Sequence, residues 1–401
     1  MTLEQKVLLN LLKSEPNCDL LKSIEVFDMH TVLEEAKKQS VFLMAMDSAA
    51  KIPNFLPEEE FKSEYEFAFL RTLKNAEVLA AQQNLVKILK DKGYPYAIIK
   101  GEAASANYPK PELRTLGDVD FLIDPRDQKE ITALLISNGF TKKEEDHICH
   151  VVFKKPKSHL EMHFEIVGIP NGKPGETVRR YMANALEHTE LKNNGAGEFA
   201  VLKPAKNGLV LLLHMAHHML TEGIGLRHLA DWGFFVDKTK GEAFWDTQLV
   251  PVLKEIGLLE YAKIMAKTSA LYLGTYCPDF AKEVSDELAN EVIEDILTGG
   301  NFGRKDKAYT ESGTMVSNHA KDGVRKSKLG NVLGVLKDTV FYHYPITKKV
   351  KILYPFFAIY KIVRYFFLMV MGKRESLTKT LPTANKRRDL YSKMKVFEVE
   401  E

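Results

Sequence analysis

A short segment with strand-like patterning, set in a chain that is otherwise patterned as helices, most constrains the fold. Residues 95–100 (PYAIIK) and 118–124 (DVDFLID) are short apolar runs separated by a loop that contains Pro109 and Pro111. Runs of this kind, bounded by turn residues, predict two buried strands. Residues 147–166 alternate in polarity on both sides of KKPKS, which predicts a hairpin. The chain must therefore fold around a sheet.

Helical periodicity surrounds this segment on both sides. Apolar residues recur at three-and-four spacing over residues 3–50, with Asp28 as a candidate N-cap, and residues 58–92 form a long amphipathic pattern without Gly or Pro. From Pro204 to about residue 297 the pattern is again helical almost throughout. We therefore expect an α+β fold in which helices flank a mixed sheet, with helices at the N-terminus and a helical C-terminal half.

Length and charge divide the chain further. A chain of 401 residues allows two or three domains at roughly 100 to 200 residues each. Residues 301–401 carry 21 Lys and Arg against 9 Asp and Glu, a formal charge of +12, whereas the totals of 56 and 54 leave −10 for residues 1–300. We predict an N-terminal helical region (1–93), a sheet-containing core (94–200), a helical domain (201–300) and a basic C-terminal region (301–401).

Cysteine usage and the N-terminal sequence indicate a compartment. Cys18, Cys149 and Cys277 lie far apart and show no close metal-ligand spacing, which predicts a reducing environment. The first twenty residues have only a short apolar run, broken by Asn10, and lack the pattern of a secretory signal. We expect a cytoplasmic protein, with peripheral attachment to the inner face of the membrane left open.

The segment 350–372 in the basic region is strongly apolar and aromatic. Lys361 and Arg364 interrupt it, so it has fewer than the ~20 clean residues that a spanning helix needs. Three alternatives follow: a helix packed on the body, an interfacial helix, and a true membrane anchor. The interfacial alternative implies an anionic membrane surface as a partner, because basic residues within 348–374 would meet anionic headgroups.

Two acidic residues at the start of the second strand suggest metal chemistry. Asp118 and Asp120 flank Val119, so both carboxylates project from one face of the strand. Two like charges this close repel each other, and a divalent cation between them relieves the repulsion. Mg²⁺ prefers oxygen ligands and commonly bridges carboxylates to phosphates, which makes it the expected ion.

The second arm of the hairpin, residues 159–166, adds carboxylates on one face. Its apolar side chains face one side of the sheet, and its polar side chains Glu161, His163 and Glu165 face the other. Glu161 or Glu165 could approach the aspartates from a neighbouring strand and complete a three-carboxylate site. With two metal ions, such a site stabilises the attacking and leaving oxygens of phosphoryl transfer, and the third acid can accept a proton.

Basic residues and a glycine turn lie beside these acids. The first strand runs into Lys100 and Gly101, and the small residues that follow can begin a helix whose free N–H groups suit a phosphate. Lys100 could bind a phosphate as a point charge, and Arg114 could do so as a two-pronged fork. A plain turn and two surface charges are the alternative interpretation.

In this order the pieces resemble the nucleotidyltransferase superfamily, whose best-known fold is that of polymerase β. The stretch from 95 to 124 is similar to the bacterial family of uncharacterised nucleotidyltransferases, and the resemblance spans roughly residues 28–240. One departure is Glu102, where the superfamily usually has Ser or Gly after the turn glycine. The residues that match the family pattern are Lys100, Gly101, Tyr108, Pro109, Arg114, Asp118, Asp120, Glu161 and His163.

The resemblance implies a polymerase β-like catalytic core in the sheet region and a Mg²⁺-dependent enzyme. Such an enzyme would transfer NMP from an NTP, for example ATP, to a hydroxyl group and release pyrophosphate. It implies that Asp118, Asp120 and Glu161 are the catalytic residues and hold two Mg²⁺ ions, with Mn²⁺ as an alternative. It favours Glu161 over Glu165 as the third acid, and it assigns the triphosphate to Lys100, Gly101 and Arg114.

A histidine cluster lies in the helical half. His214, His217 and His218 share one helical face, with His228 and Asp231 downstream. Their spacing permits a zinc site, a polar patch that lines the cleft, or contacts to the acceptor substrate. For the acceptor side we single out His163, His214, His218 and Asp231, the last as a carboxylate that orients an imidazole.

Two other functions remain alternatives from the sequence. One is a non-catalytic nucleotide-binding or partner-binding module on the same fold. The other is a metal-dependent glycosyltransferase, although in those folds Asp-x-Asp commonly ends a strand. The acceptor could be a small molecule, a glycan, a protein or RNA. The acidic body argues against duplex DNA, since affinity for DNA comes largely from neutralised phosphates.

Overall fold

The computed structural model describes residues 1–398, apart from residues 14, 17–26, 53–54, 144–147, 314–333, 335, 338 and 342. The prediction made on Cys18 lies outside the described residues, and so does part of the basic region. Cys149 and Cys277 are free thiols.

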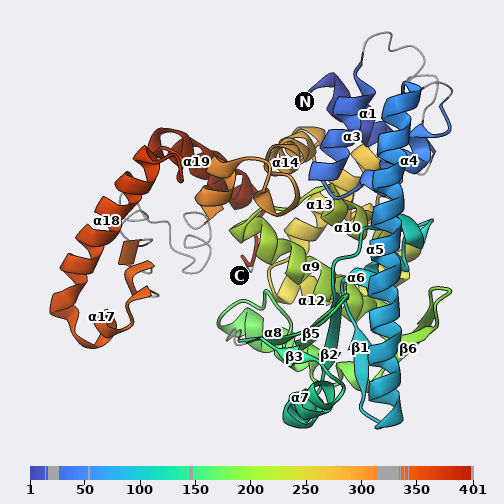
Figure 1. Cartoon of the computed structure of the whole chain (residues 1–401), viewed down its shortest axis with the longest axis horizontal. Helices are drawn as coiled ribbons and strands as arrows, with labels where there is room; N and C mark the ends of the chain where they lie inside the picture. Colours follow the sequence, from blue (N-terminus) through green and yellow to red (C-terminus); the bar gives the residue numbers. More distant parts are fainter. Residues whose placement is uncertain are drawn as a thin grey trace.

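A seven-stranded sheet forms the lower part of the molecule in Figure 1, with strand order β3-β4-β5-β2-β1-β7-β6. The pairs β2–β5 and β1–β7 are parallel and the others are antiparallel, so the sheet is mixed. The predicted α+β fold with a mixed sheet and flanking helices is therefore confirmed. The strands are β1 (Tyr96–Ile98), β2 (Val119–Ile123), β3 (Thr141–Lys142), β4 (His150–Lys155), β5 (Ser158–His163), β6 (Thr189–Asn193) and β7 (Glu198–Leu202).

One face of the sheet packs against α5 (Glu58–Asp91) and α7 (Gln128–Ser137). The apolar side chains that alternate along the strands meet these helices, for example Phe121 on β2 and Leu160 on β5, both fully buried. Figure 1 shows α5 running beside the sheet and up along the helical body. The polar side chains of the same strands must therefore face the opposite way, toward the helices of the C-terminal half.

The other face meets a helical body with one shared core. Strand residues such as Ala97 and Leu122 belong to the same apolar cluster as α9 (Pro204–Thr221) and α10 (Leu226–Lys238). The N-terminal helices join this cluster too, since α1 (Leu3–Leu11), α3 (Met29–Lys38) and α4 (Phe42–Ala49) contribute buried side chains to it. The four-part division of the chain stays a prediction, but all four parts contribute residues to this one hydrophobic cluster.

Local sequence explains where many elements begin and end. Asp28 is the N-cap of α3 as predicted, because its carboxylate accepts hydrogen bonds from the N–H groups of His30 and Thr31. The remaining helices of the body are α6 (Gly101–Ser105), α8 (Lys173–Met182), α11 (Glu242–Phe244), α12 (Val250–Glu255), α13 (Leu259–Leu273) and α14 (Asp286–Gly299). Short 3₁₀ turns lie at Pro111–Leu113, Pro125–Asp127, Ala185–Glu187, Asp279–Ala281, Asn301–Gly303 and Lys351–Leu353, and a π-helical turn at Trp245–Leu249.

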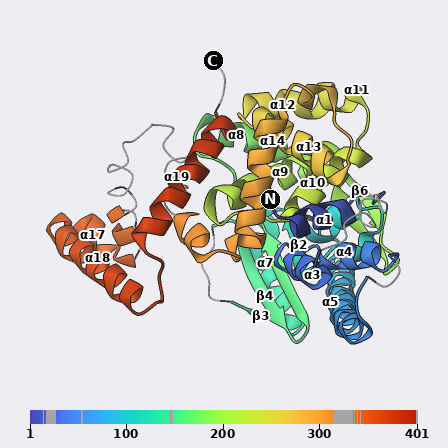
Figure 2. The same ribbon diagram turned by 90° about the horizontal axis from the view of Figure 1, so that it is seen from above.

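A C-terminal arm projects from the body in both Figure 1 and Figure 2. It contains α17 (Ile346–Lys349) and α18 (Tyr354–Val370), and α19 (Leu377–Lys393) joins it to the body. By length and composition, Lys351–Val370 is the one helical segment among the described residues that could cross a membrane, and 6% of it is buried. The structure does not pack this segment on the body, because little of it is buried and its inner face contacts Tyr344 of the arm itself.

Candidate active site

The paired strands β2 and β5 bring three carboxylates to one face of the sheet. Asp118 directly precedes β2, Asp120 lies within it, and Glu161 lies on β5. In the parallel pairing of these strands, Asp120 is opposite Glu161. Side chains two residues apart share a face, so all three acids lie on the same side. Glu165 follows β5 and forms an ion pair with Arg179 at 2.6 Å instead.

These acids line a cavity of about 290 Å³ between the sheet and the helical body. Lys100, Gly101 and Arg114, which the sequence had assigned to phosphate binding, also line it. His214 and His218, predicted on the acceptor side, face it from α9. The other lining residues are Gly117, His150, Val167, His217, Arg227 and Phe302.

Asp120 is the most tightly held of the three acids. It is 6% exposed, and its Oδ1 atom lies 2.8 Å from Lys100 Nζ and 2.8 Å from His163 Nε2. Burial disfavours the carboxylate ion, but the charge of Lys100 and the hydrogen bond from His163 outweigh burial and hold the pKa of Asp120 well below its usual range. Asp120 is therefore ionised and already carries a counter-charge.

The pKa of Asp118 is shifted in the opposite direction, upward. Burial, followed by the negative charges of Asp120 and Glu161, raises the pKa of Asp118 from 3.8 to about 7. For Glu161, burial is again the largest influence and opposes ionisation, yet the hydrogen bond from His163 leaves its pKa lowered. Three acids that repel one another in this way form a site that a divalent cation would stabilise.

Lys100 adopts an unusual backbone conformation at the turn into α6. Its φ of 52° lies in the left-handed region, which costs a residue with a side chain of order 1–3 kcal/mol. This conformation places the ammonium group against Asp120 and 3.3 Å from His163 Nε2. Glu102, the departure from the family pattern, does not line the cavity, because its carboxylate is buried and accepts a hydrogen bond from Asn194 Nδ2 at 3.1 Å.

Arg114 and Asp231, which the sequence analysis assigned to different sides of the site, form an ion pair with each other. Arg114 donates from Nε to Oδ1 of Asp231 at 2.7 Å and from Nη2 to Oδ2 at 2.8 Å, and both side chains are buried. Nε and Nη2 of Arg114 are therefore engaged by a carboxylate, although the residue lines the cavity, and its contact with a phosphate stays a prediction. Asp231 does not line the cavity or orient an imidazole, because its Oδ1 also accepts the hydroxyl of Tyr108 at 2.6 Å.

Arg227, at the start of α10, is a cavity residue that the sequence analysis missed. Its Nε atom is buried and has no hydrogen-bond partner within the described part of the chain. Burial and the nearby charge of Arg114 lower the pKa of Arg227. An unpaired guanidinium opposite a set of carboxylates suits an anionic group bound between them. The only signal in the sequence was the Leu-Arg dipeptide after the histidine-rich helix.

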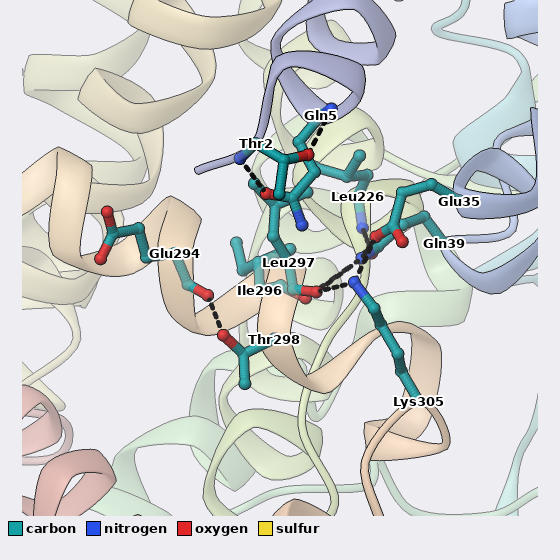
Figure 3. A network of polar contacts seen from close by, with 10 residues as sticks. All are labelled: Thr2, Gln5, Glu35, Gln39, Leu226, Glu294, Ile296, Leu297, Thr298 and Lys305. Carbon is teal, nitrogen blue, oxygen red and sulfur yellow. Dashed lines mark hydrogen bonds and ion pairs between the residues drawn. The ribbon is translucent and has the colours of Figure 1, made fainter. Parts of the chain in front are cut away.

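Gln39, which directly follows α3, contacts the start of α10, and Figure 3 shows the hydrogen bonds of its amide group. Gln39 is fully buried, and its Oε1 accepts the N–H of Leu226 at 3.0 Å. Its backbone carbonyl accepts the N–H of Arg227 at 3.4 Å. Its Nε2 donates to Glu35 at 3.0 Å and to the carbonyl of Ile296 at 3.3 Å. The start of α10 is thus fixed by a residue that lies outside the cavity.

The histidines separate into two groups. His214 and His218 have ring centroids 4.3 Å apart on α9, and burial is the main reason that the pKa of His214 is well below its usual value. His214 is therefore neutral near pH 7. Among the described residues, the histidines of this cluster do not form a group of three closely spaced metal ligands. His163 is fully buried against Asp120 and is absent from the residues that line the cavity, so its role on the acceptor side stays a prediction.

A second candidate metal group shares one acid with the carboxylate set. His150, Glu161 and His163 offer ligand atoms that all lie within 4.8 Å of one another. Asp118, Asp120 and Glu161 supply the oxygen ligands that Mg²⁺ prefers, whereas the imidazoles suit ions that also accept nitrogen, such as Mn²⁺ or Zn²⁺. The residues present therefore fit a divalent cation at the sheet side of the cavity.

Among the comparisons with known proteins, the match to a protein family is informative. A family model described as "Uncharacterised nucleotidyltransferase" matches residues 25–274. Among solved structures, an antigenic nucleotidyltransferase-like protein from Paracoccidioides brasiliensis is 17% identical, and the match covers 47% of this chain and 91% of that chain. Its TM-score of 0.28 is too low for a conclusion about the fold. A search of curated proteins found no match.

Proposed function

Because this chain belongs to the family of uncharacterised nucleotidyltransferases, we propose that it transfers an NMP group from an NTP to a hydroxyl of an acceptor and releases pyrophosphate. One observation carries the proposal: three carboxylates on one face of the sheet line the same cavity as Arg227, whose Nε has no hydrogen-bond partner among the described residues. Carboxylates can hold divalent ions and the arginine can hold phosphate, and an NTP bound with its metal needs both.

The metal side of the proposed site consists of Asp118, Asp120 and Glu161. When bound there, Mg²⁺ would neutralise phosphate charge and stabilise the attacking and leaving oxygens of an in-line displacement. Glu161 would accept the proton of the attacking hydroxyl, since it lies at the exposed side of the set and opposite Asp120 on the neighbouring strand. Mn²⁺ is the alternative ion, because His150 and His163 lie beside Glu161.

The phosphate side consists of Lys100, the Gly101 turn and Arg227. Lys100 neutralises Asp120 in the structure, 2.8 Å from its Oδ1 atom. A divalent cation on Asp120 would take over that charge and leave the ammonium group for a phosphate oxygen. Arg227 would bind the same phosphates from the opposite wall, whereas Arg114 supports that wall through its ion pair with Asp231. Catalysis in this arrangement is positioning and charge neutralisation.

The acceptor side remains the histidine-lined part of the cavity. His214 and His218 line it, and the neutral imidazole of His214 can exchange hydrogen bonds with a hydroxyl group. A small molecule, a glycan, a protein or an RNA end all supply such a hydroxyl, so we leave the acceptor class open.

A binding titration with each of the four NTPs, in Mg²⁺ and in EDTA, tests the proposal. We expect the wild-type protein to bind at least one NTP in a metal-dependent way and the double variant Asp118→Asn, Asp120→Asn to lose that binding. Release of pyrophosphate in the presence of an acceptor extract would then establish transfer. Metal-dependent binding without any turnover would point to a non-catalytic nucleotide-binding module, and no binding to any NTP would overturn the proposal.

A further inference from the structure

The outer face of α18 is an exposed apolar stripe. Its side chains follow helical spacing of three and four residues, and each is 47–82% exposed. Contiguous apolar surface of this kind is uncommon on soluble proteins and marks a site of contact with a protein or a membrane. We define the stripe by Phe356, Ile359, Val363, Phe366, Phe367 and Val370.

The inner face of α18 is used within the arm. Phe357 stacks on Tyr344 with ring centroids 4.3 Å apart, and Lys361 Nζ lies 5.4 Å from the same ring. The hydroxyl of Tyr365 donates to the carbonyl of Glu375 at 2.9 Å. The helix therefore has one face that packs within the arm and an opposite face that no described residue covers.

The arm is mounted on the body through a buried arginine of α19. Arg387 is 1% exposed, and it donates to the carbonyl of Tyr309 at 2.9 Å and to that of Met219 at 3.0 Å. Its guanidinium carbon lies 3.9 Å from the centre of the Tyr309 ring. Figure 2 shows α18 held away from the body at the far end of α19. The exposed stripe therefore belongs to an arm with a defined attachment.

The positive charge of the arm indicates that the partner of the stripe is anionic. Residues 346–374 contain seven basic residues and no acidic residue, which gives a formal charge of +7. An uncharged apolar partner would gain nothing from these charges, whereas an anionic lipid surface attracts each of them. The basic residues are Lys348, Lys349, Lys351, Lys361, Arg364, Lys373 and Arg374.

We infer that the stripe on α18 docks onto an anionic lipid bilayer, with the helix lying in the plane of the interface. The apolar side chains would enter the acyl boundary while the basic residues around them meet headgroups. A spanning orientation is disfavoured because Lys361 and Arg364 lie near the middle of the helix and would each have to enter the hydrocarbon. The inference does not depend on the proposed nucleotide chemistry.

Vesicle flotation of the full chain tests this docking. We expect the protein to float with vesicles of phosphatidylcholine and phosphatidylglycerol, to remain unbound with phosphatidylcholine alone, and to be released at high salt. The double variant Val363→Glu, Phe367→Glu should lose binding. The matched control is Phe69→Glu, Leu73→Glu, which alters exposed apolar residues of α5 and should bind as the wild type does.

Neutralising the basic residues one at a time separates the electrostatic part of vesicle binding from the part that the apolar side chains contribute. Each neutralised basic residue, beginning with Lys348→Gln and Lys349→Gln, should lower the partition constant about fivefold, the factor that corresponds to about 1 kcal/mol. Circular dichroism of every variant checks that the fold is kept. Absence of wild-type binding to either vesicle would overturn the inference. So would a dimer that Val363→Glu, Phe367→Glu disperses, because the stripe would then contact a second copy of the chain.

Discussion

Arg114 and Asp231 form a two-point ion pair in which Nε donates to Oδ1 at 2.7 Å and Nη2 donates to Oδ2 at 2.8 Å. The pair joins the loop before β2 to the middle of α10, so it connects the sheet with the helical body at the cavity wall. Tyr108 adds a hydroxyl donor to the same carboxylate at 2.6 Å. The position of the carboxylate-bearing strand relative to Arg227 on α10 therefore depends on this buried pair.

Breaking that pair should cost stability. Asp231→Asn leaves the buried guanidinium of Arg114 without its counter-charge, and we expect unfolding free energy to fall by about 3–5 kcal/mol. Chemical denaturation measures the loss. In the double variant Arg114→Met, Asp231→Asn, neither partner of the pair is charged, so its cost should be smaller than the sum of the costs of Arg114→Met and Asp231→Asn. Strict additivity would show that the two residues do not act as a pair.

Lys100 should compete with a divalent cation for Asp120. In EDTA, Lys100→Met leaves a carboxylate that is 6% exposed without its ammonium partner, so we expect a lower Tm than wild type. Mg²⁺ should then raise the Tm of the variant more than that of the wild type, because it supplies the missing charge without displacing a lysine. Lys110→Met, which breaks the exposed pair with Asp47, should change little in either buffer. An equal Mg²⁺ effect in both proteins would contradict the competition.

The raised pKa of Asp118 should make metal-free stability depend on pH. As pH rises, the unfolded chain releases the Asp118 proton near its ordinary pKa of 3.8, whereas the folded protein keeps that proton until about pH 7. This contribution to stability is complete below about pH 4 and is lost as pH rises through about 7. In EDTA, Asp118→Asn should therefore be more stable than wild type at pH 8, with the difference shrinking toward pH 5.

The wild type must be compared with Asp118→Asn, because buried histidines change the pH dependence of stability in the opposite direction. Burial lowers the pKa of His214 and of His228, so the stability that they contribute is lost as pH falls through and below their ordinary value of 6.5. That loss is common to both proteins and cancels in the difference. Mg²⁺ at pH 8 should abolish the advantage of Asp118→Asn. A difference that does not vary between pH 5 and pH 8 would contradict the shifted pKa of Asp118.

Arg227 should contribute to nucleotide affinity without contributing to stability. Arg227→Gln removes a charged hydrogen-bond donor to phosphate, and we expect NTP affinity to fall about 10- to 100-fold. The Tm should not fall, since Nε of Arg227 has no partner within the described residues and burial disfavours the charge. Calorimetry and thermal melting measure the two quantities. The guanidinium carbons of Arg227 and Arg304 lie 5.6 Å and 5.5 Å from the centre of the Phe302 ring, but Arg304 does not line the cavity, so Arg304→Gln is the control.

The carboxylate face could be predicted from the sequence because the period of a strand fixes it. Asp118 and Asp120 are two residues apart at the start of an apolar run, and Glu161 occupies the polar face of an alternating strand. Only the register between β2 and β5 remained to be found, and it places Glu161 opposite Asp120. Local patterning therefore predicted the shared face of Asp118 and Asp120 but left Glu161 and Glu165 as alternatives, and it was the family resemblance that favoured Glu161.

The opposite wall could not be predicted, because it depends on contacts between distant parts of the chain. Asp231 is 117 residues from Arg114, and Gln39 is 187 residues from Leu226. No spacing rule relates such positions. The strand β6 was missed for another reason. It lies at the edge of the sheet, its last three residues are exposed, and its sequence, TELKN, therefore lacks a buried apolar face that alternation could reveal. Hydropathy likewise could not show that α18 would be exposed, since buried and exposed apolar helices have the same composition.

The single core shared by the two ends of the body dictates an order of assembly during synthesis. Helices α1, α3 and α4 bury their apolar faces against helices such as α13 and α14, which emerge from the ribosome more than 200 residues later. The sheet needs only residues up to Leu202 to complete its strand pairing. While the strands pair, the N-terminal helices therefore still lack the C-terminal helices that cover part of their apolar surface. That interval is when a nascent chain is most prone to aggregation and most in need of a chaperone.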